Sequence, residues 1–192
     1  PVVTSRFSLQ GNRSLKPYSV AANMNNTVRI NAEEHKYWNS ESADYWVSQK
    51  PALDRLLAPW TRLLLEAAEL SGGERIADIG CGTGATTLKF ATSVDTEGWI
   101  TGIDLSRKLI DCAIKSAHER AIENVIFVAA DAAEYRFPCL QDLMVSRCGV
   151  MFFGDLVAAF SNLRSGLTRT GRILLVVWRA PEQNEWYQFP VR

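Results

Sequence analysis

The sequence predicts an α/β protein built on one doubly wound, mostly parallel sheet. From Arg75 onward, short apolar runs alternate with segments of helical periodicity, which is the pattern of repeated βαβ units. The first of these runs leads into a turn with glycine at positions 80, 82 and 84. A chain of 192 residues has the length of one domain, and its 47% apolar and 22% charged residues are typical of a folded protein.

The N-terminal residues 1–30 differ in composition from the rest. They include Arg and Lys but no Asp or Glu, and their apolar residues follow no period, so we expect an unstructured tail. A transit peptide is the alternative, although Gly11, Asn12 and Pro17 would interrupt its amphipathic helix.

Residues 31–73 are expected to form a helical lid segment, and residues 74–192 the cofactor-binding core. In the lid segment, Asn31 and Glu34 have the spacing of a capping pair that opens a helix through Trp38. A second short helix is expected from Ser42 to Ser48. Pro51 then opens a longer amphipathic helix that runs to Ser71-Gly72-Gly73, with a kink at Pro59.

The core is expected to contain five strands with helices between them. The strands are predicted at Arg75–Ile79, Trp99–Ile103, Val125–Ala129, Asp142–Ser146 and Arg172–Trp178. The helices are predicted at about 84–93, 106–121 and 155–167, the second of them capped by Ser106. Right-handed crossovers then place the carboxyl ends of the strands at one edge, where ligands bind in such sheets.

Each of the first three predicted strands ends in residues suited to bind a nucleoside. Gly80, Gly82 and Gly84 let the backbone approach a ligand where a side chain would collide, although a tight turn alone would also use glycine. Asp104 can accept hydrogen bonds from both ribose hydroxyls, and a helix cap is its alternative role. Asp131 can accept one from an adenine amino group, and a solvated loop position is its alternative.

Charge, cysteines and hydropathy exclude several other classes of function. Lys plus Arg and Asp plus Glu number 21 each, so no global field attracts nucleic acid or anionic lipid. Four irregularly spaced cysteines and two histidines predict neither a disulfide framework nor a metal site. No apolar run is long enough to span a membrane, and we expect a cytoplasmic protein.

The combination of these motifs resembles a known family. The run from Arg75 to Trp178 resembles the core of class I S-adenosylmethionine-dependent methyltransferases, and the motifs Tyr37-Trp38-Asn39, Trp46-Val47 and Gln49-Lys50-Pro51 resemble those of ubiquinone and menaquinone biosynthesis enzymes. The resemblance implies a Rossmann-like fold, S-adenosyl-L-methionine as cofactor and a small-molecule acceptor. It implies that Tyr37, Trp38 and Trp46 lie over the cofactor as a lid, although ordinary core packing would also explain these aromatic residues.

The resemblance also assigns cofactor contacts. They are expected from Asp78, Gly80, Gly82 and Gly84 for the methionine part, Asp104 and Leu105 for the ribose, Asp131 and Ala132 for the adenine, and Arg147 from the fourth loop, with Cys81 of the glycine turn as a further contact.

No catalytic base is identified in the sequence. His118 lies off the apolar face of its helix, and we expect it to be exposed. His35 is also expected at the surface, with contact to a substrate as the alternative.

The chain departs from the family in one respect. The family's sheet has two further strands after the fifth, and this sequence ends shortly after Trp178, so we expect a truncated core. The fifth strand would then have an unpaired edge that favours self-association. Two alternative functions stay open: an NAD-dependent oxidoreductase, because Gly80, Gly82 and Ala85 also satisfy the dinucleotide fingerprint, and a non-catalytic cofactor-binding remnant.

Overall fold

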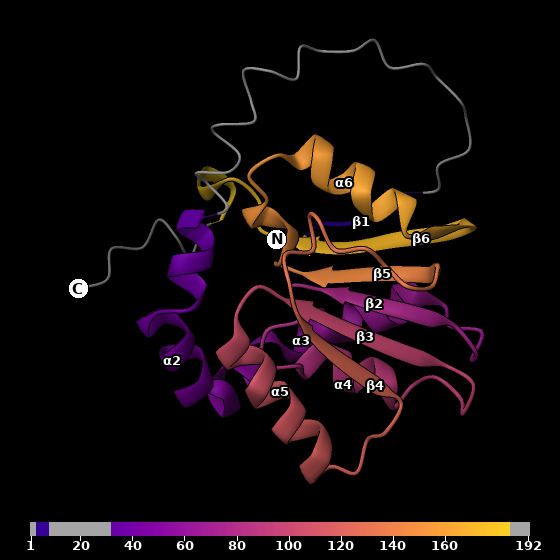
Figure 1. Ribbon diagram of the computed structural model, residues 1–192, viewed down its shortest axis with the longest axis horizontal. Coiled ribbons are helices and arrows are strands. Elements are labelled where there is room, and N and C mark those ends of the chain that lie inside the picture. The colour runs from indigo at the N-terminus through magenta and orange to yellow at the C-terminus, as the bar shows by residue number, and fades with distance from the viewer. Residues whose placement is uncertain (1–2, 8–31, 185–192) are drawn as a thin grey trace.

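The computed structural model describes residues 3–7 and 32–184, and it shows one sheet with helices on both faces (Figure 1). The strands are β1 Val3–Phe7, β2 Arg75–Ile79, β3 Trp99–Asp104, β4 Val125–Ala129, β5 Gln141–Arg147 and β6 Leu167–Val177. The helices are one over residues 32–38, α2 Glu41–Ser48, α3 Lys50–Ala68, α4 Ala85–Ala91, α5 Arg107–Glu119 and α6 Leu156–Ser165, with 3-10 turns at Val150–Phe152 and Pro181–Gln183. The predicted α/β fold is confirmed.

The sheet reverses its strand order next to the glycine turn. The order is β1-β6-β5-β2-β3-β4, and the five strands from β6 to β4 are parallel. From β2 the chain proceeds outward through β3 to β4, and then returns to place β5 on the other side of β2. The switch point therefore lies between β2 and β5, and a crevice is expected at the carboxyl ends of these strands.

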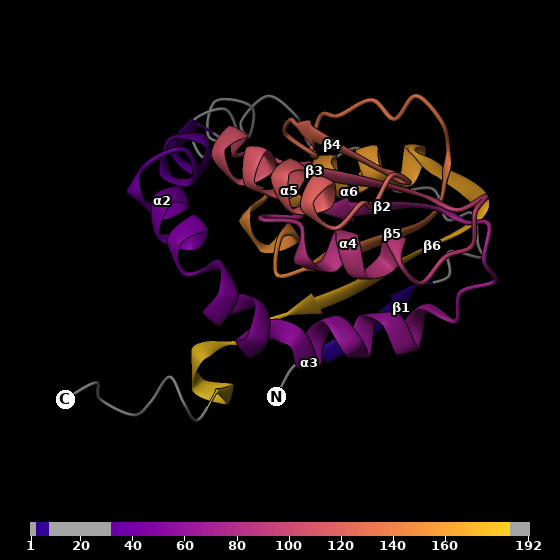
Figure 2. The ribbon, with the colours of Figure 1, turned by 90° about the horizontal axis from the view of Figure 1, so that it is seen from below.

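Alternate residues of β2 point into two separate cores. Ile76 packs with Leu64 of α3 and Phe90 of α4, whereas Ile79 packs in a cluster with Leu163 of α6. All of these side chains are buried, and each contributes about 2 kcal/mol of hydrophobic stabilisation. The rigid double-faced sheet fixes the loops at its carboxyl ends, and Figures 1 and 2 place α2 beyond these ends.

The first strand corrects two of the sequence expectations. Residues 3–7 were expected in an unstructured tail, but they form β1, which pairs antiparallel with β6 from Val3↔Val177 to Phe7↔Ile173. The edge of β6 was expected to be unpaired, and β1 covers it instead. The predicted self-association through an exposed edge stays untested, and it would now use the edge of β1. Residues 8–31, with the predicted cap Asn31, lie outside the described residues.

The helix and strand boundaries follow local signals closely. Ser106 caps α5 as predicted, with its side chain accepting a hydrogen bond from the Leu109 N–H. Pro59 lies inside α3, which continues to Ala68. β6 begins at Leu167, five residues before the predicted start, because its first residue already pairs with Gln141 of β5. Within the described ranges, no helix is long and apolar enough to cross a bilayer.

Candidate active site

The glycine turn between β2 and α4 is held against the end of β3. Gly80, Gly82 and Gly84 all have positive φ angles, of 69°, 56° and 84°. The N–H groups of Gly80 and Cys81 both donate to the Ile103 carbonyl, at 2.9 and 3.0 Å. Backbone hydrogen bonds to β3 therefore hold the glycine turn in place at the carboxyl ends of the strands.

Asp104 joins the turn to the loop that follows β3. Its Oδ2 accepts from the Gly82 N–H at 2.8 Å, and its Oδ1 accepts from the Ser106 N–H at 2.8 Å. Burial raises the pKa of this carboxyl, while the two N–H donors oppose the rise. Each carboxylate oxygen has a second lone pair, so Asp104 can still accept from a ligand hydroxyl.

Asp78 and Gly84 lie behind the turn and do not line the cavity described below. Asp78 is fully buried and accepts from the Thr87 hydroxyl at 2.7 Å. Burial raises the pKa of Asp78 to about 6, against the hydrogen bond from Thr87 and the charge of Arg147. A Cβ at Gly84 would lie 2.9 Å from the Cβ of Ala113, so this glycine allows close packing of α4 on α5.

The ends of β4 and β5 supply the next polar groups. Asp131 accepts from the Ala133 N–H through Oδ1 at 2.8 Å. Arg147 donates from Nη1 to the Thr61 hydroxyl of α3 at 2.7 Å. Burial lowers the pKa of Arg147, but the nearby carboxylates of Asp78 and Asp54 favour its charged form.

These strand ends surround a cavity of about 350 Å³. Eight of the ten predicted contact residues line it: Gly80, Cys81, Gly82, Asp104, Leu105, Asp131, Ala132 and Arg147. The opposite side is mostly apolar and comes from the N-terminal helices and from the segments that follow β5 and β6, with the carboxylates of Glu34 and Asp54 also in the lining. Its residues include Trp38, Trp46, Leu53, Leu57, Trp60, Phe152, Phe153 and Trp178.

Aromatic contacts close the cavity from the N-terminal side. Trp38 lies edge-on to Phe152, with ring centroids 5.2 Å apart, and 6.2 Å from Trp46. The Trp38 Nε1 donates to the carboxylate of Glu34, one helical turn earlier, at 2.9 Å, and this bond fixes the orientation of the indole ring. Tyr37 is more than half exposed and is not among the cavity-lining residues. Of the three aromatic residues expected in a lid, Trp38 and Trp46 line the cavity and Tyr37 does not, and their role over a cofactor stays a prediction.

Several cavity residues were not identified in the sequence. Trp60 and Trp178 contact each other edge-on with centroids 4.4 Å apart, although they lie in α3 and directly after β6. Trp178 could have been predicted from the sequence, because it follows a parallel strand and the carboxyl ends of parallel strands converge at the site. His35 and His118 are exposed, and neither is among the lining residues.

A sheet of this order with a glycine turn at its switch point defines a Rossmann-like α/β protein. A family model described as a methyltransferase domain matches residues 70–186. The chain therefore belongs to the methyltransferase family, and the class I assignment made from the sequence is confirmed.

Individual relatives agree with the family match. The chain is 36% identical over 116 residues to the aklanonic acid methyltransferase DauC of Streptomyces sp. (strain C5), covering 60% of this chain and 53% of DauC. It is 24% identical over 155 residues to the demethylmenaquinone methyltransferase of Listeria welshimeri, covering 80% and 66% of the two chains. The crystal structure of YcgJ from Bacillus subtilis superposes with a TM-score of 0.59 at 31% identity, covering 64% of this chain and 52% of YcgJ. The chain thus spans about half the length of DauC and YcgJ.

Proposed function

We propose that this chain binds S-adenosyl-L-methionine and transfers its methyl group to a small-molecule acceptor. The observation that carries the proposal is the contact of Asp104 with the Gly82 N–H beside the cavity. It places a carboxylate, suited to two ribose hydroxyls, directly against a glycine turn that a ligand can approach. The eight cavity-lining contact residues would hold the cofactor, while Asp78 and Gly84 would support the turn from behind.

The turn has the shape that such a cofactor requires. Gly82 lines the cavity, and a Cβ placed on it would meet no atom within 4 Å. The space in front of the turn can therefore hold part of a ligand. Bound cofactor would supply a methyl group activated by its sulfonium. An acceptor nucleophile would attack the methyl carbon in line with the carbon–sulfur bond, and S-adenosylhomocysteine would leave.

The contribution of the chain to this reaction is positioning and exclusion of water. The side chains of Trp38, Trp46 and Phe152 would cover an acceptor and keep solvent away from the reacting atoms. The acceptor would pack mostly against apolar groups beside the carboxylates of Glu34 and Asp54, and neither apolar nor acidic groups favour a nucleic acid. The zero net charge supports the same choice, and we retain the cytosol as the proposed compartment.

Isothermal titration calorimetry with S-adenosylmethionine, S-adenosylhomocysteine and NAD tests the cofactor. We expect the first two to bind and NAD not to bind. Asp104→Ala should lower the affinity for S-adenosylhomocysteine at least tenfold, because both ribose contacts and the support of the turn are lost. The matched control is Asp111→Asn, which removes an exposed carboxylate that pairs with Arg107 on α5.

An Asp104→Ala variant that folds and binds like the wild type would refute the proposed site. Tight binding of NAD would instead favour the oxidoreductase alternative. Formation of S-adenosylhomocysteine with a panel of small acceptors tests the transfer step. Binding without any transfer would favour a non-catalytic cofactor-binding remnant.

A further inference from the structure

Asn39 connects the lid segment to the loop that carries Asp104. It lies between the helix over residues 32–38 and α2, and its Nδ2 donates to the His35 carbonyl at 2.9 Å. The same Nδ2 donates to the Leu105 carbonyl at 3.2 Å, and its Oδ1 accepts from the Arg107 N–H at 3.1 Å. One amide side chain thus holds the backbone on each side of Ser106.

The loop held by Asn39 is part of the proposed cofactor site. Leu105 lines the cavity, and Asp104 accepts from the N–H groups of both Gly82 and Ser106. Ser106 is buried and caps α5. The position of the Asp104 carboxylate therefore depends on a loop whose two flanking peptides are bound to the lid.

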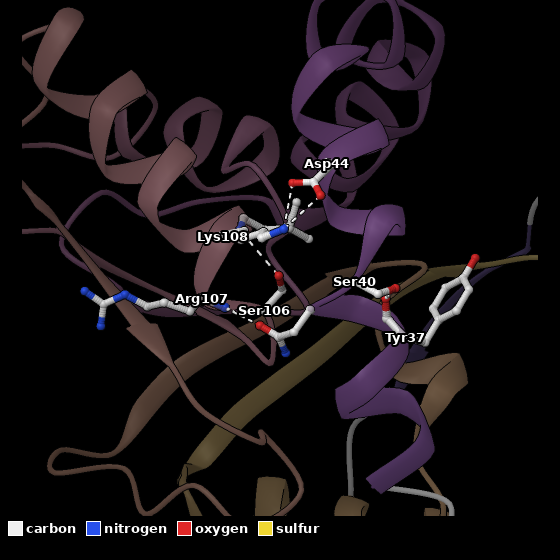
Figure 3. A network of polar contacts seen from close by, with 8 residues as sticks. Tyr37, Ser40, Asp44, Ser106, Arg107 and Lys108 are labelled. Carbon is white, nitrogen blue, oxygen red and sulfur yellow. Dashed lines mark hydrogen bonds and ion pairs between the residues drawn. The ribbon is translucent and has the colours of Figure 1, made fainter.

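The residue before Asn39 faces the cavity. Trp38 lines it and contacts Phe152, whereas Asn39 makes the polar contacts to the loop. The residue that covers the cavity is therefore adjacent in the chain to the residue that binds the loop. Figure 3 shows Asp44 of α2 paired with Lys108 near the start of α5, with Ser106 and Arg107 beside it.

We propose that Asn39 is a positioning residue that couples occupation of the cofactor site to closure of the lid. The inference rests on the proposed function, since it takes the nucleoside to lie against Asp104. With the nucleoside bound, the loop is fixed, and Asn39 holds the lid over the cavity. By linkage, a closed lid raises the affinity for the nucleoside by the same factor.

Two variants separate this coupling from general attachment of the lid. Asn39→Ala removes the two contacts to the loop. Asp44→Asn removes the ion pair with Lys108, 2.8 Å long and exposed, which joins the same two segments. We expect Asn39→Ala to weaken binding of S-adenosylhomocysteine about tenfold, because it removes one partly buried and one exposed hydrogen bond to the loop. Asp44→Asn should change the affinity less than twofold.

Hydrogen exchange measured by mass spectrometry provides a readout that a purely structural role would not change. In the wild type, S-adenosylhomocysteine should slow exchange in residues 32–48 as well as in residues 104–109. In Asn39→Ala at saturating ligand, protection should remain in 104–109 and be lost in 32–48. Asp44→Asn should retain protection in both segments.

The outcomes distinguish this inference from the proposed function. A wild-type chain that does not bind S-adenosylhomocysteine refutes the proposed function and this inference with it. A wild-type chain that binds it without slower exchange in 32–48 refutes the coupling alone, even if Asn39→Ala fails to fold. A folded Asn39→Ala variant with wild-type affinity and lid protection also refutes the coupling.

Discussion

Two glycines of the same turn should respond differently to substitution by alanine. Gly80 and Gly82 have φ angles of 69° and 56°, in the left-handed region that favours glycine. A Cβ at position 80 would lie 2.6 Å from the Cα of Gly149, whereas a Cβ at position 82 would meet no atom within 4 Å. Both variants share the backbone strain, but only Gly80→Ala adds a clash with backbone.

The structure gives the size of each effect. Left-handed backbone costs an alanine about 1 kcal/mol, so Gly82→Ala should lower the free energy of unfolding by about that amount. Overlap with the backbone of Gly149 should bring the loss for Gly80→Ala to about 3 kcal/mol. Gly82→Ala should nevertheless weaken binding of S-adenosylhomocysteine at least tenfold, because its methyl group enters the space proposed for the cofactor.

Urea denaturation and calorimetry on the two variants separate stability from binding. The reasoning about the cofactor is refuted if Gly82→Ala binds S-adenosylhomocysteine as tightly as the wild type. The reasoning about packing is refuted if the two variants unfold at the same urea concentration.

Three further variants test the polar groups beneath the turn. Burial raises the pKa of Asp78 from 3.8 to about 6, so the folded chain binds this proton more tightly than the unfolded chain, and about 3 kcal/mol of stability is lost as pH rises through that range. Asp78→Asn should therefore flatten the dependence of the unfolding free energy on pH between pH 4 and 6, and an unchanged slope would contradict the assignment. Thr87→Val removes the hydrogen-bond donor to the Asp78 carboxylate. Urea denaturation should show that the free energy of unfolding falls by about 2 kcal/mol at pH 7 and by less at pH 5, where Asp78 gains a proton, and an equal loss at the two pH values would contradict this role of Thr87. The Ser146 hydroxyl donates to the Ile79 carbonyl at 2.7 Å and accepts from the Gly149 N–H at 3.1 Å, so Ser146→Ala should cost about 2 kcal/mol in the same assay, and a loss below 0.5 kcal/mol would exclude a structural role.

The parallel core was predictable because its signals are local. β2 and β4 have the predicted bounds, since short apolar runs between glycine and polar residues leave few alternatives to a buried strand. The convergence of Gly82, Asp104 and Asp131 followed from topology alone, because all parallel strands present their carboxyl ends at the same edge.

The remaining features depend on contacts that no local pattern encodes. β1 was missed because its pairing with β6 joins segments from opposite ends of the sequence, and a lone five-residue strand has no distinctive period. Asn39 was not identified as a site residue because its partners at Leu105 and Arg107 are backbone groups, which any sequence would offer. The bond between Asp78 and Thr87 was also not predictable, because it joins the end of β2 to a side chain of α4; the expected contact of Asp78 with the cofactor stays a prediction.

The pairing of β1 with β6 has a consequence for the order of folding. During synthesis β1 leaves the ribosome before every other described strand, yet its partner residues 173–177 are made after all the other parallel strands. The sheet can assemble outward from β2 while β1 is still unpaired, because contacts close in sequence form with less loss of chain entropy. Among the described strands, β1 precedes all others in the chain but can pair only after β6 has been made.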